Sequence, residues 1–130
     1  ITFINDSKST NVSSTYNALT SKNDNIILIM GGDNKKTSYK PLIDIINEKV
    51  KLLVLIGENS ESLNAEMSVN VKKMIFENLV DATSYIFSKM ESGDIVLFSP
   101  GSSSFCMYNN YEDRGDHFKK IINDYVYSKN

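Results

Sequence analysis

Three short runs of apolar residues stand out along the chain, at residues 26–30, 52–56 and 95–98. None of them alternates with polar residues, so both faces of each segment are expected to be covered, as in a parallel sheet flanked by helices. Each run is followed within two residues by glycine or proline, which favour turns. Residues 1–4 predict a further strand that is already under way where the sequence begins, so we expect a piece of a longer protein.

Between these runs, apolar residues recur at the three- and four-residue spacing of an amphipathic helix. A short helix is expected over residues 60–67 and a short strand over 73–76. Strands that alternate with helices of this length form right-handed βαβ units. We therefore predict an α/β, Rossmann-like three-layer domain, with a mostly parallel sheet of five or six strands flanked by helices. The longer helices are expected around residues 12–19, 41–46 (with Pro41 as the first helical residue), 79–90 (with Asn78 as the cap) and 118–125.

Composition and charge narrow the class of function. The chain has 130 residues, the size of one domain, and its 41% of hydrophobic residues can form a core without disulfides or structural metal. A net charge of −2 gives no basic surplus for nucleic acid, and no apolar run approaches the ~18 residues of a membrane span. One cysteine and one histidine exclude an internal disulfide and an all-Cys/His zinc site. We expect a cytoplasmic protein with no metal site of its own, no nucleic-acid partner and no membrane insertion.

Polar residues cluster where three of the predicted strands end, at residues 6–11, 31–36 and 99–104. In open α/β sheets, ligands gather outside the carboxyl ends of the strands. Two of these segments place a lysine near an aspartate, and the third offers hydroxyl groups and helix-initiating amides. Together they predict a pocket for a small anion, either a carboxylate or a phosphate.

These candidates also have purely structural interpretations. Cys106 has no evident base beside it and is expected to be a packing residue on a short helical turn. His117 is expected in the first turn of the last helix. No phosphate-loop or dinucleotide fingerprint is present, so the residues alone indicate an anion-binding α/β domain. For Thr10 and Ser104, the residues alone favour a role as helix N-caps. The remaining candidates have structural interpretations of their own: Asp6 and Asp33 as turn formers, and Lys8 and Lys35 as solvated loop charges.

Taken as a set, the three segments resemble the C-terminal domain of the Mur ligases that add D-glutamate. Residues 6–11, DSKSTN, are similar to that family's DSKATN signature, and residues 31–35 look like its glycine-glycine-x-x-lysine loop. Residues 99–105 and 110–118 resemble its closing segment, commonly SPACASFD followed by NYEERGDHF. This sequence has Gly-Ser-Ser at 101–103 in place of Ala-Cys-Ala and Cys106 in place of the aspartate, but Ser104 remains in register.

The resemblance implies that residues 1–130 work beside an N-terminal domain that holds a UDP-sugar and a central domain with the phosphate loop and magnesium ligands. The family enzyme uses ATP and Mg²⁺ to phosphorylate the carboxylate of UDP-N-acetylmuramoyl-L-alanine, and the amine of D-glutamate attacks the acyl phosphate, in peptidoglycan precursor synthesis. Lys8 and Lys35 are the candidate catalytic residues. By resemblance, Lys35 and Thr10 hold the α-carboxylate, Ser104 and the backbone N–H of Tyr111 the side-chain carboxylate, and Asp6 the nucleotide, while Lys8 lies near the transferring phosphate or the amino acid.

Two other interpretations remain open at this stage. The chain could belong to another amide ligase, such as a different Mur ligase or a folylpolyglutamate synthetase, and the amino acid that supports turnover distinguishes these. It could also be a freestanding nucleotide- or amino-acid-binding module, which the length of the open reading frame would reveal. In either ligase interpretation, the isolated domain is expected to be inactive.

Overall fold

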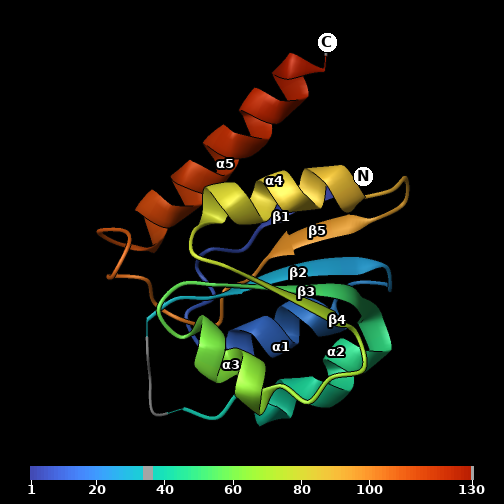
Figure 1. The fold of residues 1–130 in the computed structure, drawn as a ribbon, viewed down its shortest axis with the longest axis vertical. Helices are drawn as coiled ribbons and strands as arrows, with labels where there is room; N and C mark the ends of the chain where they lie inside the picture. The colour runs from blue at the N-terminus through green and yellow to red at the C-terminus, as the bar shows by residue number, and fades with distance from the viewer. Residues whose placement is uncertain (34–36, 130) are drawn as a thin grey trace.

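The computed structural model describes residues 1–33 and 37–129, in which strands and helices alternate (Figure 1). Every strand expected from the sequence is present, including the short one near residue 73. The strands are β1 (Thr2–Asn5), β2 (Ile26–Gly31), β3 (Val50–Ile56), β4 (Lys72–Phe76) and β5 (Ile95–Phe98). The helices are α1 (Val12–Thr20), a 3-10 turn η1 (Lys40–Leu42), α2 (Ile43–Lys49), α3 (Ser60–Glu66), α4 (Leu79–Lys89) and α5 (Tyr111–Ser128).

The five strands form one sheet in the order β1-β5-β2-β3-β4, and every pair of neighbours is parallel. The last strand of the chain therefore lies between the first two. Its residue Phe98 pairs with Asn5 on one side and with Ile29 on the other, so β1, β5 and β2 end at the same edge. The predicted α/β fold is confirmed, with five strands that are all parallel.

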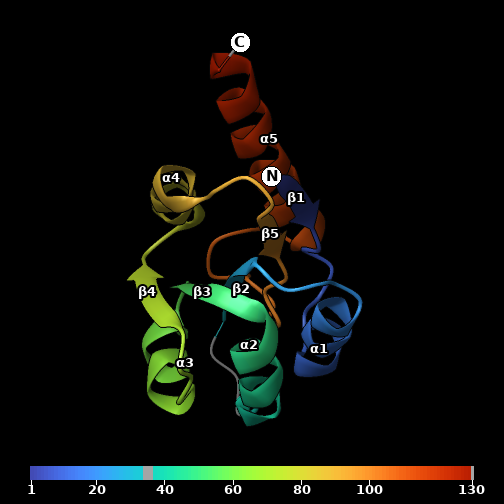
Figure 2. The same ribbon diagram turned by 90° about the vertical axis from the view of Figure 1, so that its right-hand side faces the viewer.

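Helices cover both faces of the sheet, α1, α2 and α3 on one and α4 and α5 on the other (Figures 1 and 2). Alternate residues of the central strands serve the two cores. Leu28 of β2 packs in the core that includes Leu19 of α1, whereas Ile29 packs in the core that includes Ile86 of α4 and Phe118 of α5. All six residues of β2 are buried, which explains why its sequence shows no polar alternation.

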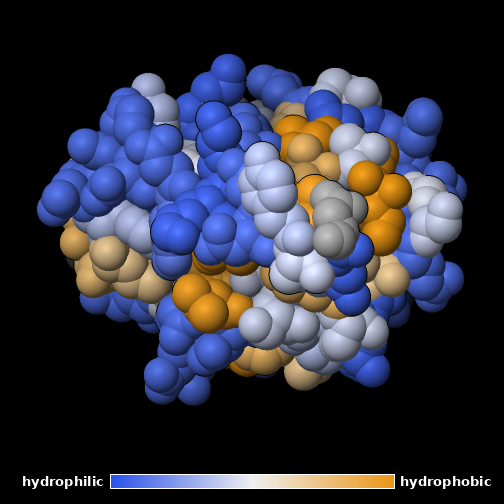
Figure 3. All heavy atoms as spheres, turned by 90° about the horizontal axis from the view of Figure 1, so that it is seen from above, coloured by the Kyte–Doolittle hydropathy of each residue, from blue (hydrophilic) through white to orange (hydrophobic). Residues whose placement is uncertain are grey.

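The surface of the domain is mainly hydrophilic, in contrast to its apolar interior. Seen from the side of α4 and α5, hydrophilic residues dominate and hydrophobic ones form separate patches (Figure 3). The longest helix, α5, packs on α4 through the stacked rings of Phe87 and Tyr125, whose centroids lie 3.9 Å apart, and then extends beyond the sheet (Figure 1). Within the described residues, no helix combines the length and the apolar character that crossing a bilayer requires.

Two details of the predicted helices change. Pro41 lies in η1 rather than at the start of an α-helix, because the N–H of Leu42 bonds the carbonyl of Tyr39, three residues back. The last helix begins at Tyr111, well before its apolar stripe, so His117 lies in its second turn and not in the first. Asn78 is confirmed as the cap of α4, since its side chain accepts the N–H of Asp81 at 2.8 Å.

A lysine closes the C-terminal end of α1. The ammonium of Lys49, at the end of α2, donates to the carbonyls of Leu19 at 3.1 Å, Thr20 at 3.2 Å and Lys22 at 2.6 Å. A helix leaves its last carbonyls without intrahelical partners, and a cation there also complements the helix dipole. Lys49 thus joins α1 to α2 on one face of the sheet.

Replacing Lys49 with Met should lower the free energy of unfolding by about 1–2 kcal/mol, because carbonyls lose a charged donor while the aliphatic stem is kept. Urea denaturation of the chain measures this. Lys120→Met is the control, since Lys120 is exposed and pairs only with Asp124 on the same helix. Equal stability of the two variants would show that Lys49 contributes no more than a surface charge.

Candidate functional site

The three polar segments singled out in the sequence come together at one edge of the sheet. The loop after β5 lies between the loops after β1 and β2, as the strand order requires. The chain leaves β1 toward α1 on one face and leaves β5 toward α5 on the other (Figure 2). A crevice between strands whose connections diverge in this way is the usual ligand site of an open α/β sheet.

A buried arginine near the start of α5 holds two of these loops together. The guanidinium of Arg114 donates from Nε to the hydroxyl of Ser7 at 2.9 Å and from Nη2 to the carbonyl of Ser7 at 2.6 Å. Its Nη1 donates to the carbonyl of Ser102 at 2.7 Å. The hydroxyl of Ser7 in turn donates to the carbonyl of Tyr111 at 2.8 Å. Arg114 therefore fixes the loops after β1 and β5 against the first turn of α5.

The position of Arg114 is unusual for a charged side chain, because its exposed fraction is 0%. Burial lowers the pKa of Arg114 to about 10, so the group remains a cation at neutral pH. Its charge centre lies 5.8 Å from the ring of Phe98, at the end of β5. A buried cation is costly unless its donors are satisfied, which makes these three hydrogen bonds a strong constraint on the loops.

The carboxylate of Asp6 joins the ends of β1 and β5. One of its oxygens accepts hydrogen bonds from the hydroxyls of Ser9 and Ser99, the latter at 2.9 Å. The backbone N–H of Asp6 bonds the carbonyl of Phe98 at 2.8 Å. The interpretation of Asp6 as a turn former is therefore confirmed in part, since Ser9 closes the turn, but the bond to Ser99 reaches across to another strand.

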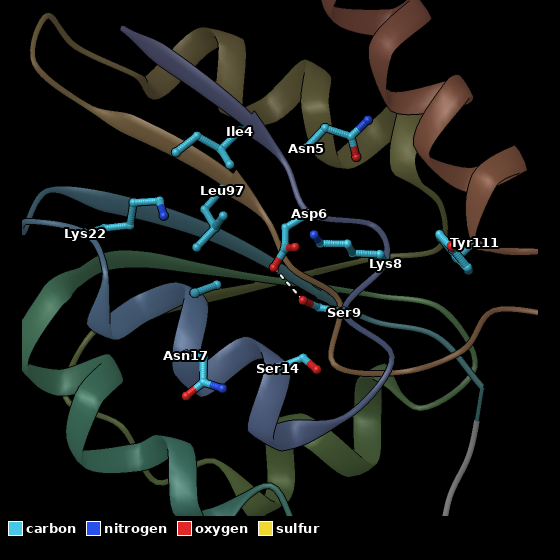
Figure 4. Close-up of a pocket in the computed structure, with 11 residues that line it drawn as sticks. Ile4, Asn5, Asp6, Lys8, Ser9, Ser14, Asn17, Lys22, Leu97 and Tyr111 are labelled. Atoms are coloured by element: carbon cyan, nitrogen blue, oxygen red, sulfur yellow. Dashed lines mark hydrogen bonds between the residues drawn. The ribbon is translucent and has the colours of Figure 1, made fainter.

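A hollow of about 580 Å³ lies beside Asp6, between β1 and α1 (Figure 4). Its wall includes the charged groups of Asp6 and Lys8, the hydroxyl of Ser9 and the side chain of Tyr111. The side chain of Lys8 is exposed. Cationic and hydroxyl donors around such a hollow suit an anionic or polyhydroxylated ligand.

Ser104, in the loop after β5, is 5% exposed, and among the described residues its hydroxyl is the buried side-chain group without a hydrogen-bond partner. No helix begins there, and the carbonyl of Ser104 accepts the N–H groups of Met107 and Tyr108 to form a turn. The N-cap interpretation of Ser104 is thus wrong, because its side chain bonds no backbone amide. A buried hydroxyl left unpaired is costly, and a ligand would satisfy it.

Asp33 links the loop after β2 to the same segment. Its carboxylate accepts the N–H of Phe105 at 2.7 Å and that of Cys106 at 2.8 Å, and its own N–H donates to the carbonyl of Ser103 at 2.7 Å. Partial burial would raise the pKa of Asp33, but hydrogen bonds from Cys106 and Phe105 outweigh this effect and hold the pKa below its usual value. Gly32 permits this approach, since a Cβ there would lie 2.2 Å from the carbonyl oxygen of Ser103.

A buried network of polar side chains connects the loop after β5 to the loops after β2 and β3. The hydroxyl of Ser102 lies 2.7 Å from the hydroxyl of Tyr39 and accepts from Nδ2 of Asn59 at 3.1 Å, while Oδ1 of Asn59 accepts the N–H of Gly32 at 2.8 Å. Burial raises the pKa of Tyr39, so its hydroxyl stays protonated. Ser102 stands where the resembled family usually has cysteine, and here its hydroxyl connects three loops.

The remaining candidates are placed as follows. Thr10 is not the cap of α1, because Asn11 is: its side chain accepts the N–H of Ser14 at 2.9 Å. Tyr111 is the first residue of α5, so its N–H is one of the amides that a helix leaves without an intrahelical partner. Lys35 lies outside the described residues.

The structure also places Cys106 and His117. Cys106 does lie on a short turn, but it is exposed, so the packing interpretation is wrong. Although the residue is exposed, partial desolvation of the thiol, followed by the neighbouring Asp33, raises its pKa, which makes it a poor nucleophile. His117 lies with its Nδ1 2.6 Å from the hydroxyl of Tyr108, and so ties α5 to the end of the loop that carries Ser104.

Comparisons with known proteins show which family the chain belongs to. The family described as "Mur ligase, glutamate ligase domain" matches residues 1–101. The chain belongs to the Mur ligase family. Among curated UDP-N-acetylmuramoylalanine–D-glutamate ligases, the chain is 39% identical to that of Bdellovibrio bacteriovorus over 122 residues, covering 94% of this chain and 26% of the relative. It is 36% identical to that of Chlamydia felis over 124 residues, covering 95% and 30%.

A third relative, the ligase of the same name from Geobacter metallireducens, is 41% identical over 123 residues, covering 95% of this chain and 27% of the relative. The chain thus spans little more than a quarter of the curated relatives it matches. Within the described residues, no three side chains of His, Cys, Asp or Glu gather in a way that could hold a metal ion.

The sequence did not identify Arg114, Asn59 and Tyr39 as residues that build this candidate site. Arg114 lies within residues 110–118, the segment that carries the family resemblance, but the many charged residues around it do not indicate that it is buried. Asn59 and Tyr39 come from segments without any motif. Its spacing was the one available signal: Arg114 lies four residues before Phe118, the first residue of the apolar stripe, and residues four apart lie on the same helix face.

Replacing Arg114 with Lys should lower the free energy of unfolding by about 2–4 kcal/mol, because one ammonium cannot reproduce a fork that reaches both Ser7 and Ser102. Urea denaturation of the chain measures the loss, with exposed Lys119→Met on the same helix as the control. A change below about 1 kcal/mol, within the range of a single ordinary hydrogen bond, would contradict the role given to the guanidinium.

Proposed function

We propose that residues 1–130 form the C-terminal domain of an ATP-dependent ligase that adds D-glutamate to UDP-N-acetylmuramoyl-L-alanine. The observation that carries the proposal is the buried, unpaired hydroxyl of Ser104, held rigidly at the edge of the sheet where α/β proteins bind ligands. Three curated relatives at 36–41% identity bear the name of this ligase. Their function belongs to peptidoglycan precursor synthesis, which we place in the cytoplasm.

In this proposal, the loop after β5 and the start of α5 bind the side-chain carboxylate of D-glutamate. Ser104 donates its hydroxyl proton to one carboxylate oxygen, and the N–H of Tyr111 donates to the carboxylate from the helix terminus. Helix N-termini favour anions because their amides and dipole both point toward the ligand. The α-carboxylate is assigned to Thr10 and Lys35, so that the two ends of the amino acid are held at separate points.

The nucleotide is assigned to the end of β1. Asp6, whose carboxylate already accepts two hydroxyl protons, suits a ribose hydroxyl, and Lys8 suits a phosphate or the bound amino acid beside the same hollow (Figure 4). Bound ATP supplies the phosphoryl group that activates the carboxylate of the acceptor. Mg²⁺ is assigned to the remainder of the ligase, together with most contacts to ATP and to the UDP-sugar.

The contribution of this chain to the reaction is therefore positioning. Its loops hold D-glutamate by both carboxylates, which leaves the amine as the free nucleophile and fixes its direction of approach. Holding two reactants in a reactive geometry can supply roughly 7–11 kcal/mol of a reaction barrier. Lys8 and Lys35 also place positive charge near the site where negative charge develops during transfer.

The two alternatives receive less support. A different amide ligase would be expected to resemble other curated enzymes at least as well, whereas the relatives described above share the D-glutamate name. A freestanding binding module has no parallel among these relatives, in each of which the matched segment is 26–30% of a longer ligase.

A ligation assay with the full-length protein tests the proposed function. Phosphate release should require ATP, UDP-N-acetylmuramoyl-L-alanine and D-glutamate together, and L-glutamate should not replace D-glutamate. The chain of residues 1–130 alone should release none. Activity of the isolated chain, or full-length turnover with a different amino acid in preference to D-glutamate, would contradict the proposal.

Ser104→Ala separates a ligand role from a structural one. Because the hydroxyl has no partner among the described residues, its removal should not lower the free energy of unfolding. In the full-length ligase it should raise the KM for D-glutamate about tenfold and leave the KM for ATP nearly unchanged. Ser88→Ala, on the exposed face of α4, is the control. An unchanged KM for D-glutamate would show that Ser104 does not touch the substrate.

A further inference from the structure

Asp33 has no assigned role in the proposed reaction, yet it contacts the backbone on both sides of Ser104. Its N–H donates to the carbonyl of Ser103 at 2.7 Å. Its carboxylate oxygens accept one amide each, Oδ2 from Phe105 at 2.7 Å and Oδ1 from Cys106 at 2.8 Å. The residue whose hydroxyl is unpaired is thus bracketed by three hydrogen bonds to a single aspartate.

Hydrophobic burial does not fix this part of the loop. The side chain of Phe105 is 71% exposed, and Cys106 is exposed as well. Each residue therefore contributes little packing energy that could hold the backbone in place. Among the described residues, the carboxylate of Asp33 is the acceptor found for both amides, and hydrogen bonds to a charged acceptor are stronger than neutral ones.

The other end of the segment is held by a different group. Arg114 donates to the carbonyl of Ser102 at 2.7 Å, two residues before Ser104. The guanidinium of Arg114 and the carboxylate of Asp33 thus bind the loop before and after Ser104. The positive charge of Arg114 also contributes to lowering the pKa of Asp33. Arg114 is fully buried and also holds Ser7, whereas Asp33 is partly exposed and, within residues 1–33 and 37–129, its side chain bonds this loop.

We infer that Asp33 is a positioning residue that fixes the hydroxyl of Ser104 for the side-chain carboxylate of the amino-acid substrate. The inference rests on the proposed function and adds to it a residue that does not itself touch D-glutamate. Asp33 acts through the backbone of residues 103–106, so its effect depends on the presence of the serine hydroxyl.

A double-mutant cycle in the full-length ligase tests this dependence. Asp33→Asn keeps the shape of the side chain but exchanges one acceptor oxygen for a donor, so one of the two amides loses its partner. The variant should raise the KM for D-glutamate by about tenfold and leave the KM for ATP within about twofold. Asp81→Asn, a carboxylate in the first turn of α4, makes the same chemical change away from the site and serves as the control.

The decisive comparison is made in the Ser104→Ala background. If Asp33 acts through the hydroxyl, adding Asp33→Asn to Ser104→Ala should raise the KM for D-glutamate by less than about twofold, so the two effects are strongly non-additive. Two effects that multiply fully would show that Asp33 acts independently of Ser104 and would overturn the inference. A folded Asp33→Asn variant with a KM for ATP raised as much as the KM for D-glutamate would also overturn it.

Should Asp33→Asn fail to fold, the same cycle is run with Asp33→Glu, which keeps the charge but displaces the carboxylate by one methylene group. The expected non-additivity with Ser104→Ala is the same. Turnover by the unaltered ligase tests the proposed function on its own. If that ligase uses D-glutamate but both cycles are additive, the role of Asp33 is wrong and the proposed function stands.

Discussion

The site depends on the hydrogen bonds of one buried group, the guanidinium of Arg114. Removing a cation from water costs several kcal/mol unless its donors find partners in good geometry. Here those partners are main-chain and hydroxyl groups of Ser7 and Ser102, which lie 107 and 12 residues away in the sequence. The cation can be accommodated only if the loops after β1 and β5 adopt this arrangement, so the requirement to satisfy Arg114 is also the requirement that forms the site.

Once these loops are fixed, the polar groups around them are used almost completely. Asp6 accepts two hydroxyl protons, Ser102 joins the network of Tyr39 and Asn59, and Asp33 accepts two amides. Ser104 is the buried exception among the described residues. In a loop whose other groups are satisfied, one unpaired hydroxyl is a preorganised donor, since a ligand can bind it without breaking a bond within the protein.

The fold could be predicted from the sequence because its signals are local. Uninterrupted apolar runs such as residues 26–30 occur where both faces of a strand are covered. The helices show apolar residues at the three- and four-residue spacing of an amphipathic helix. The meeting of three polar segments at one edge also followed, because it depends on parallel strands ending together. The hydrogen-bond partners of Arg114, the unpaired state of Ser104 and the bond from Asn59 to Ser102 could not be predicted. Each depends on side-chain contacts between segments far apart in the sequence, which no local pattern records.

A structure of the full-length protein bound to the D-glutamyl product of the proposed reaction tests the central claim most directly. The account predicts that the side-chain carboxylate of the glutamyl group lies within hydrogen-bond distance of the Ser104 hydroxyl and of the Tyr111 N–H, while the hydrogen bonds of Arg114 to Ser7 and Ser102 remain in place. A glutamyl carboxylate bound elsewhere, with the Ser104 hydroxyl still unpaired or satisfied by the protein itself, would contradict it.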